Sequence, residues 1–472
     1  MIKYIVSQHK LFAINGRAFL FLPNENAIFE ADRETRELLD QLSGKKGLTE
    51  KAIMAHLKIP DEEKEQLFQE LISQKILLAA DKKIPDHQRF EVEPIILPVN
   101  TLVLHVTDAC NLGCLYCYHS SSKKANQRKR TMTVEVAEQA IDFLYDQAKD
   151  LPEVGLVFFG GEPILNFKLI SKAVQHALEK SETTGKKISL TLTTNGTLLS
   201  EEVISFLHNH QIGVTVSIDG LEIIHNKYRP FPDGSPSYRT ILKNIENLFR
   251  IYNGVPVPAR VTVAGSSENI PDTLDHLLNL GFAEVGFAPV TTDDIASQLN
   301  NQEMDQMLKQ FQILSQQFLE AALDDRLLGF SNLIDLLLVL HEGEVKNYPC
   351  GAGLGLFSVD PDGDLFLCQR LTGEEAFLMG DIFSGLSTAK VNAFRKRAAI
   401  TQKETCIHCW VRNICAGGCY HEALVREGDI MKPNLHYCQW IKEWVATGIE
   451  VYGQLAAIRP EFLDRLSLLR AN

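Results

Sequence analysis

The sequence predicts an α/β protein built around a partial (β/α)6 barrel, with a small α+β module before it and a cysteine-rich extension after it. Two observations predict the barrel: six strand-like runs are almost continuously apolar, and helical stretches separate them. A third observation, the bunching of ten cysteines into two parts of the chain, predicts the extension. The 472 residues are enough for roughly two to four domains.

Residues 1–90 form the first predicted domain, which has the organisation of a winged helix. Tyr4–Ile14 and Phe19–Phe29 carry alternating apolar residues on either side of Asn15-Gly16, which predicts a β-hairpin. Three helices are expected to follow, over Arg33–Leu42, Thr49–Leu57 and Asp61–Leu77. Because these helices are mixed or acidic in charge, we favour peptide binding over DNA binding for this domain. Residues 84–96 are interpreted as a linker.

The barrel is the second predicted domain, over residues 97–325. Its strands are expected at Thr101–Val106, Val154–Phe159, Ile188–Thr194, Gly213–Ile218, Ala259–Ala264 and Glu284–Ala288. Helices are expected near 133–149, 167–182, 200–210, 238–252, 271–280 and 303–323. Functional loops should lie at the carboxyl ends of the strands. The basic run from Lys123 to Arg130 is interpreted as a solvated loop, or as a holder for an acidic peptide.

Charge and hydropathy limit the partners. The net charge is −13 and the pI about 5.6, which excludes a broad surface for nucleic acid or an anionic membrane. No run of 18 apolar residues occurs, and Met1-Ile2-Lys3-Tyr4 does not open a signal peptide. We therefore expect a cytoplasmic protein. In that reducing compartment, clustered cysteines favour metal or catalysis over disulfides.

The extension is the third predicted domain, over residues 326–450, and residues 451–472 are predicted to form a C-terminal tail. From about residue 345 the helical periodicity gives way to glycine-rich, cysteine-bearing loops. Such a segment builds little apolar core, so bound metal is expected to organise it.

The first cysteine group, Cys110-x3-Cys114-x2-Cys117, directly follows the first predicted strand of the barrel. Three thiolates on one loop can ligate three irons of a [4Fe–4S] cubane and leave the fourth iron open. Structural zinc is the alternative, but it requires four ligands, and the loop offers no fourth Cys or His at a fitting spacing.

This motif after the first strand resembles that of the radical S-adenosylmethionine (SAM) superfamily. Gly160-Gly161-Glu162-Pro163 resembles the turn of this family that approaches the methionine end of SAM, where glycines remove bulk and a carboxylate can hold the amino group. Ser217-Ile218-Asp219-Gly220 ends the fourth strand. The resemblance implies that SAM is contacted by Tyr116 near the adenine, Ser217 near the ribose, Arg229 at the carboxylate, and also by Gly160, Gly161, Glu162 and Asn195.

The later cysteines resemble the seven-cysteine SPASM extension of peptide-modifying radical enzymes, which holds two auxiliary [4Fe–4S] clusters. The resemblance implies an outer cluster on Cys406, Cys409, Cys415 and Cys438, and an inner cluster on Cys350, Cys368 and Cys419. Three cubanes have twelve irons and SAM takes one, which leaves eleven positions for ten cysteines. Glu344, another oxygen or nitrogen group, or a substrate thiolate is expected to fill the last position.

The whole pattern resembles the thioether-forming group of ribosomal-peptide maturases, which includes quinohemoprotein amine dehydrogenase maturation proteins. It implies a precursor peptide or small protein bound through residues 1–90, and an electron donor such as flavodoxin or ferredoxin. Carbon–carbon or carbon–oxygen cross-linking and epimerisation remain open. A sulfatase maturase is discounted, because that group has an Asp base where Gln369 stands. A redox-sensing regulator would not need the SAM-binding motifs.

Overall fold

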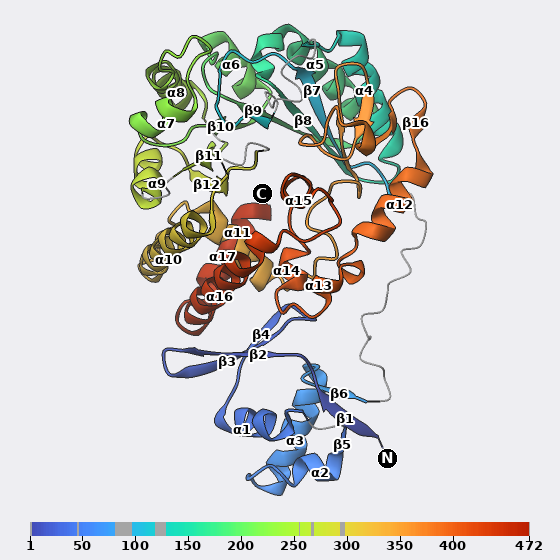
Figure 1. Cartoon of the computed structure of the whole chain (residues 1–472), viewed down its shortest axis with the longest axis vertical. Coiled ribbons are helices and arrows are strands. Elements are labelled where there is room, and N and C mark those ends of the chain that lie inside the picture. Colours follow the sequence, from blue (N-terminus) through green and yellow to red (C-terminus); the bar gives the residue numbers. More distant parts are fainter. Residues whose placement is uncertain are drawn as a thin grey trace.

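Six long apolar strands form the centre of the molecule, because strands covered on both faces are stabilised along their whole length. The computed structural model describes residues 2–44, 47–80, 97–118, 129–253, 255–265, 269–292 and 298–471. The six strands lie side by side and are all parallel (Figure 1). They are β7 (Thr101–Thr107), β8 (Glu153–Gly160), β9 (Lys187–Thr194), β10 (Gly213–Ser217), β11 (Pro258–Val263) and β12 (Glu284–Pro289). The prediction of an α/β fold with these six strands is confirmed.

Helices connect the strands and begin where the sequence supplies capping side chains. The predicted ones are α4 (Val134–Gln147), α5 (Phe167–Thr184), α6 (Glu201–Asn209), α8 (Tyr238–Ile251), α9 (Ile270–Asn279) and α10 (Asn301–Leu323). The hydroxyl groups of Thr133 and Ser200 accept backbone N–H bonds at the starts of α4 and α6, and Asn300 forms a capping box with Glu303. A short helix α7 (Glu222–Tyr228) and a 3-10 turn η2 (Pro163–Asn166) are additional.

The cysteine-rich extension continues the central sheet. β13 (Leu356–Val359) pairs in parallel with β7, and β14 (Asp364–Phe366), β15 (Leu378–Asp381) and β16 (Gly385–Leu386) add in antiparallel order. The sheet is therefore mixed and ten-stranded. The extension also contains short helices: η4 (Glu375–Phe377), α12 (Thr388–Ala398), η5 (Ile400–Gln402), α13 (Glu404–Ile407), α14 (Arg412–Cys415) and α15 (Tyr420–Glu427).

Three further helices pack beside α10 and differ from the prediction. They are α11 (Ser331–His341), α16 (Leu435–Ile458) and α17 (Pro460–Ala471). The predicted domain boundary at residues 450 and 451 falls inside α16, and the predicted tail is helical. The Phe311 ring centroid lies 5.4 Å from that of Trp440 and 5.1 Å from that of Trp444. Aromatic edge-to-face contacts of this kind hold α16 against α10.

The N-terminal strands differ from the predicted single hairpin. Tyr4–Ile14 divides into β1 (Lys3–Val6) and β2 (Lys10–Ile14), and Phe19–Phe29 divides into β3 (Arg17–Leu22) and β4 (Ala27–Glu30). Pro23 and the left-handed Asn26 break the second run, because they favour a turn. β2, β3 and β4 form one antiparallel sheet, whereas β1 lies between β5 (Leu48–Thr49) and β6 (Leu77–Ala79) in another.

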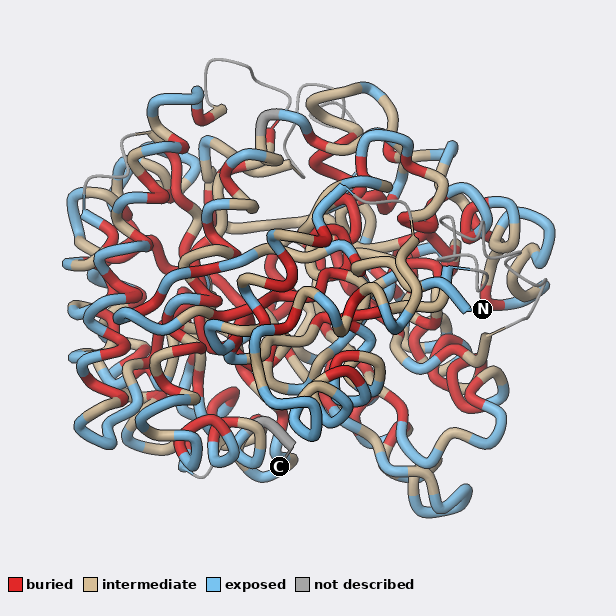
Figure 2. Tube along the Cα trace, turned by 90° about the horizontal axis from the view of Figure 1, so that it is seen from below, coloured by how far each residue is buried: buried red, intermediate tan, exposed pale blue. Residues whose placement is uncertain are grey.

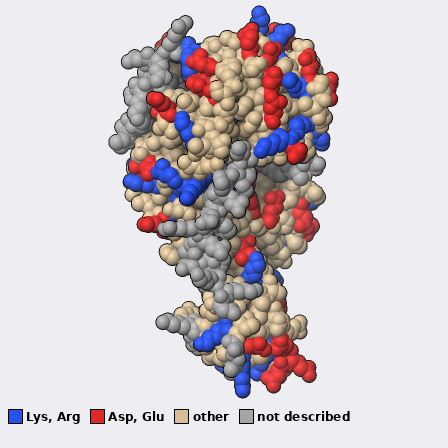
Figure 3. Space-filling model, turned by 90° about the vertical axis from the view of Figure 1, so that its right-hand side faces the viewer, with Lys and Arg blue, Asp and Glu red and all other residues tan. Residues whose placement is uncertain are grey.

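The predicted N-terminal helices are present as α1 (Arg33–Leu42), α2 (Glu50–Met54) and α3 (Asp61–Ser73). The third ends earlier than expected, because Lys75 is left-handed and the following residues pair with β1. These helices share a separate apolar core with Leu20 and Leu22 of β3. Figure 1 shows this lobe at one end of the molecule, and Figure 3 shows acidic side chains gathered on it. The predicted linker 84–96 lies outside the described residues.

The sheet β2–β3–β4 also packs on the extension with its other face. Phe12 and Phe21 contact Trp410 with ring centroids 6.0 and 5.9 Å apart, and a Cβ at Gly453 would lie 2.7 Å from Ile14. Each buried phenylalanine contributes about 2 kcal/mol, so the sheet is firmly joined to the body. Figure 2 shows buried residues through the interior of the molecule. Within the described residues, none of the helices has the length and apolarity needed to cross a membrane.

Candidate functional site

A pocket lies at the carboxyl ends of the parallel strands, where the sequence predicts functional loops. Its lining joins side chains and backbone from the ends of all six strands. Among these residues are Cys110, Cys114 and Cys117 after β7, Gly160 and Gly161 after β8, Thr194 and Asn195 after β9, Ser217 at the end of β10, Arg229 after α7, and Arg260 and Thr262 of β11. Tyr116 and Tyr118 of the cysteine loop also line it.

The glycine pair after β8 is required by the loop that carries the first cysteines. A Cβ at Gly160, whose φ is +134°, would lie 2.3 Å from the Thr107 carbonyl oxygen, and one at Gly161 would lie 2.2 Å from that of Ala109. The N–H of Gly161 donates to Thr107 and the N–H of Glu162 to Ala109, each at 2.8 Å. The glycines therefore seat the loop directly, in addition to the predicted space for a cofactor.

Asn195 fixes the first cysteine. Its Nδ2 lies 3.8 Å from the Cys110 sulfur and donates to Asn111 at 2.9 Å, and Asn111 donates in turn to Thr197 at 2.8 Å. The loop is held on its other side by bonds from the N–H of Gly113 and Leu115 to the carbonyls of residues 230 and 228. The three cysteines therefore have defined positions around the pocket.

Glu162 lies beneath the pocket wall and is fully buried. Its carboxylate accepts from the Thr194 hydroxyl at 2.8 Å and from the Asn195 N–H at 2.7 Å. Burial outweighs these bonds and raises the pKa of Glu162 to about 7. The carboxylate thus links the ends of β8 and β9, and a direct contact between Glu162 and SAM stays a prediction.

We expect the Glu162→Gln variant to gain stability relative to the parent as pH rises from about 4.5 to about 7. In this window the unfolded chain releases the Glu162 proton while the folded chain retains it, so the parent loses up to about 3 kcal/mol of unfolding free energy. Denaturant titration of the cluster-free chain at pH 5 and pH 8 measures this. A variant-to-parent difference that stays constant would contradict it, and exposed Glu246→Gln is the control.

A buried ion pair supports the opposite wall of the pocket. Nε of Arg229 lies 3.0 Å from a carboxylate oxygen of Asp219, and the Tyr116 hydroxyl donates to the same oxygen at 2.5 Å. The other Asp219 oxygen accepts from the Thr262 N–H at 3.0 Å. From the sequence, Asp219 had no role beyond its place in the motif. In the structure its carboxylate orients both Tyr116 and Arg229.

Two arginines that the sequence reasoning missed line the same pocket. Burial, and then the positive charge of Arg370, lower the pKa of Arg260, so the two guanidinium groups lie close together. Neither forms an ion pair with a carboxylate among the residues that the structure describes. Arg370 lies over the Tyr118 ring, 5.5 Å from its centroid. The Asp335 carboxylate partly offsets the effect of Arg370 on Arg260, and an anionic group in the pocket would offset it further.

The remaining cysteines fall into two groups in space. Burial raises the pKa of Cys368 to about 11, and the neighbouring Cys419 and Cys350 raise it further. Burial also raises the pKa of Cys415 to about 12, with added effects of Cys438, Cys406 and Cys409. These are the same two sets that the SPASM resemblance implies, although ligation itself stays a prediction.

Tyr118 lies between the first cysteine group and the inner one. Burial raises the pKa of Tyr118, and the nearby Cys117, Cys368 and Cys419 raise it further. Its ring centroid lies 5.6 Å from that of His421. The inner group therefore borders the pocket that the first cysteine group lines.

Glu344 lies on the surface. Half of its side chain is exposed, and its carboxylate lies 3.5 Å from the Lys346 ammonium. This arrangement does not favour Glu344 as the additional ligand.

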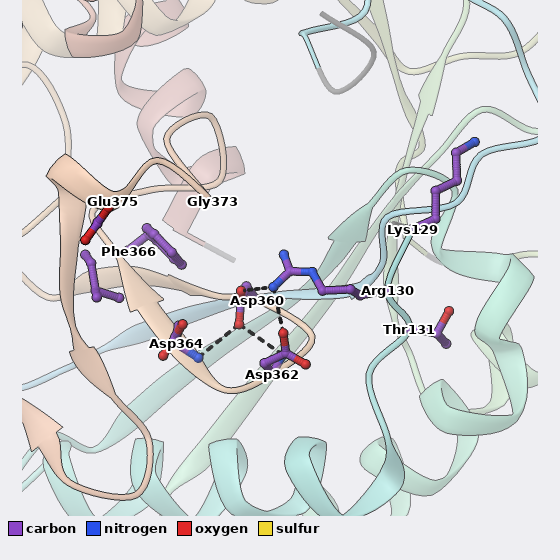
Figure 4. Close-up of a pocket in the computed structure, with 10 residues that line it drawn as sticks. Lys129, Arg130, Thr131, Asp360, Asp362, Asp364, Phe366, Gly373 and Glu375 are labelled. Atoms are coloured by element: carbon purple, nitrogen blue, oxygen red, sulfur yellow. Dashed lines mark hydrogen bonds and ion pairs between the residues drawn. The ribbon is translucent and has the colours of Figure 1, made fainter. Parts of the chain in front are cut away.

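Arg130 joins the barrel to the extension and is not the solvated residue that the sequence predicts (Figure 4). Its Nη1 lies 2.6 Å from Asp360 and 2.8 Å from Asp362, and its Nε lies 3.1 Å from Asp108. Asp360 is buried, and Asp108 stands two residues before Cys110. The rest of the predicted basic run, residues 123–128, lies outside the described residues.

The Arg130→Met variant is expected to lose about 2 kcal/mol of unfolding free energy, because it leaves the buried Asp360 carboxylate without its cation. Chemical denaturation of the variant and the parent measures this loss. Lys129→Met is the matched control, because Lys129 points away from these carboxylates (Figure 4). An equal loss in both variants would contradict the role of the Arg130 ion pairs.

The donor set fits the clusters that the resemblance implies. Burial raises the pKa of Cys110, and it raises the pKa of Cys114 to about 12, so the free thiols hold protons that a metal would displace. No three His, Cys, Asp or Glu side chains of the described chain are arranged around a single metal ion. In a cubane, by contrast, each thiolate ligates a separate iron.

Comparison with known proteins gives a consistent result. The Radical SAM superfamily model matches residues 104–280. An uncharacterized protein of Methanocaldococcus jannaschii is 32% identical over 189 residues, which span 39% of this chain and 61% of that relative. A radical SAM cyclopropyl synthase of Paramaledivibacter caminithermalis is 23% identical, over 75% of this chain and 74% of its own. A serine-type anaerobic sulfatase-maturating enzyme of Bacteroides thetaiotaomicron is 27% identical, over 73% and 87%.

Solved structures agree on the fold. The structure of native anSMEcpe with bound AdoMet has a TM-score of 0.66 and 22% identity, and covers 76% of this chain and 100% of its own. The structure of the same protein with AdoMet and the Cp18Cys peptide has a TM-score of 0.65 and 21% identity, with coverage of 76% and 99%. The α/β fold with its large mixed sheet is therefore one that these structures share.

Proposed function

We propose that this chain is a radical SAM enzyme, because the model of that superfamily matches residues 104–280, and that it joins a cysteine sulfur of a ribosomally made peptide to a carbon of another side chain. The observation that carries the proposal is the inner cysteine group. Cys350, Cys368 and Cys419 supply three thiols beside the pocket, and Glu344 lies on the surface paired with Lys346. A substrate cysteine sulfur would supply the fourth ligand position.

The chain's own residues hold and orient the reactants in this proposal. Cys110, Cys114 and Cys117 would ligate the first [4Fe–4S] cluster, and Gly160, Ser217 and Arg229 would border SAM. When bound, this pair supplies a 5′-deoxyadenosyl radical, which abstracts hydrogen from carbon. Asp219 keeps Arg229 and Tyr116 in place, and the apolar wall around residues 288–290 excludes water.

The net reaction balances without an external oxidant. One SAM, one C–H group and one S–H group give methionine, 5′-deoxyadenosine, a thioether and one proton. The electron that starts the cleavage is recovered when the C–S bond forms, so one electron from a donor such as flavodoxin or ferredoxin starts the cycle. Each cross-link lowers the peptide mass by about 2 Da.

Arg260 and Arg370 support an acidic side chain as the partner of the cysteine. Both line the pocket, and an anion between them would reduce the repulsion of their charges beyond what Asp335 already offsets. A substrate Asp or Glu carboxylate would satisfy both guanidinium groups and hold its methylene carbon near the SAM-binding residues.

The N-terminal lobe is proposed to bind the leader part of the substrate. The sheet β2–β3–β4 ends at β4, where a peptide strand can add to the open edge. Because Phe12 and Phe21 pack on Trp410, deletion of residues 1–85 would also expose an apolar face of the body. The N–H of Ala31 bonds to the Ala18 carbonyl of β3 at 2.8 Å, so the N–H of the preceding Glu30 faces the open edge. A proline at Glu30 of β4 therefore tests leader binding with less disturbance than a deletion.

A sulfatase-type maturase is the second candidate, because the sulfatase-maturating relative is 27% identical over most of its own length. That reaction would convert a Cys or Ser side chain to formylglycine and would need a base. Gln369, which follows Cys368, cannot accept a proton usefully, and this favours the thioether reaction.

Anaerobic turnover with SAM, dithionite and a precursor peptide that contains Cys and Asp or Glu tests the proposal. We expect 5′-deoxyadenosine and a product lighter by about 2 Da per cross-link. Unchanged mass would indicate epimerisation, and a loss of about 18 Da would indicate formylglycine made from cysteine. Either result would overturn the thioether proposal.

A further inference from the structure

Lys403 is a buried cation without a hydrogen-bonded partner. The residue is only 4% exposed, and its Nζ donates to no hydrogen-bond acceptor. An unpaired ammonium in a protein interior costs several kcal/mol, so native proteins rarely retain one without a counter-charge. The mechanism proposed above does not use Lys403.

The surroundings of Lys403 come from both auxiliary cysteine groups. The groups whose charges act on it are Cys406 and Cys415 of the outer group, Asp429, and Cys350 of the inner group. None of the carboxylates that the structure describes lies within ion-pair distance of it. The ammonium also lies 5.4 Å from the centroid of the Tyr420 ring, next to Cys419. It therefore stands between two sets of thiols.

The backbone leaves room for this ammonium. Gly417, with φ +89°, lies in the turn between Cys415 and Cys419, and a Cβ there would lie 2.6 Å from the Lys403 Nζ. The carbonyl of Lys403 accepts the N–H of Cys406 at 2.8 Å, which ties the lysine to the first outer cysteine. The space left by Gly417 and the backbone bond to Cys406 therefore fix the position of the Lys403 ammonium.

We propose that the Lys403 ammonium is the shared counter-charge of the two auxiliary iron–sulfur clusters and raises the reduction potentials of both. The inference rests on the proposed binding of two auxiliary clusters. Thiolate-ligated clusters carry negative charge and become more negative on reduction, so a nearby fixed cation stabilises the reduced form. Lys403 is a positioning residue in this role, because it acts through the clusters.

Redox titration of the reconstituted full chain, followed by electron paramagnetic resonance, tests the inference. The Lys403→Met variant is similar in size and lacks the charge, so the auxiliary midpoint potentials should fall while that of the first cluster stays unchanged. Lys432→Met, which removes an exposed lysine of the extension, should leave all potentials unchanged. Unaltered auxiliary potentials in Lys403→Met would overturn the inference.

Thermal unfolding supplies a second readout that a packing role would not give. In the chelator-treated chain, Lys403→Met should be as stable as the parent or more stable, because a buried ammonium is removed. In the cluster-loaded chain it should be less stable. Equal destabilisation of both forms would assign Lys403 to packing and overturn the inference. A parent chain that binds only about four irons would instead refute the proposed auxiliary clusters.

Discussion

Replacement of Cys110, Cys114 and Cys117 with alanine is expected to abolish SAM cleavage and to remove about four of about twelve irons per chain. The three thiols lie on one loop, which Asn195 and the glycine pair seat at the edge of the pocket. Without them no iron can hold SAM beside Ser217 and Arg229. Iron analysis after anaerobic reconstitution and a chromatographic assay for 5′-deoxyadenosine measure the two effects.

The irons that the triple variant retains distinguish loss of the first cluster from loss of the fold. The cysteines of the extension lie in their own groups, so about eight irons should remain. SAM cleavage that persists in the triple variant would contradict the assignment of this loop. Loss of all twelve irons would show that the variant no longer folds, and single Cys114→Ala then separates the two explanations.

Cys368→Ala is expected to abolish the cross-linked product while 5′-deoxyadenosine still forms. Cys368 lies in the inner group, which borders the pocket through Tyr118, and the proposal has this group hold the substrate sulfur. The first cysteine group is untouched, so radical formation should continue without coupling to the peptide. Quantifying 5′-deoxyadenosine and peptide product in the same reaction measures the uncoupling.

Cys438→Ala is the matched control for this variant. Cys438 lies with Cys406 and Cys409 in the outer group, whose members are not among the cysteines that act on Tyr118. It should reduce the product less than Cys368→Ala does. Full product formation by Cys368→Ala would rule out a role for the inner group in sulfur binding.

The barrel could be predicted from the sequence because its strands are rich in apolar and β-branched residues, of which every second one is buried in most strands. The pattern of apolar residues was less informative outside the barrel. α11 is so rich in leucine that it shows no helical alternation, and α16 begins among residues that the cysteine spacing dominates. The N-terminal hairpin was too long in the prediction, because a turn at Pro23–Asn26 sends β4 back along β3.

Some residues of the candidate site could likewise be predicted from the sequence, and others could not. Cysteine spacing predicts the three groups, because ligands of one cluster are close in sequence or follow a known motif. Arg130 with Asp360, and Arg260 with Arg370, are pairs far apart in the sequence. Lys403 carries no signal beyond its charge. Such residues become visible only when the fold brings distant strands and loops together.

Alkylation and fragmentation of the turnover product test the central claim most directly. We predict that iodoacetamide fails to modify the processed cysteine, and that tandem mass spectrometry locates a bridge from its sulfur to a carbon of an Asp or Glu. The mass loss of about 2 Da alone would not separate this product from formylglycine made from serine. A product that is lighter by this amount and still has a free, alkylatable cysteine would contradict the account.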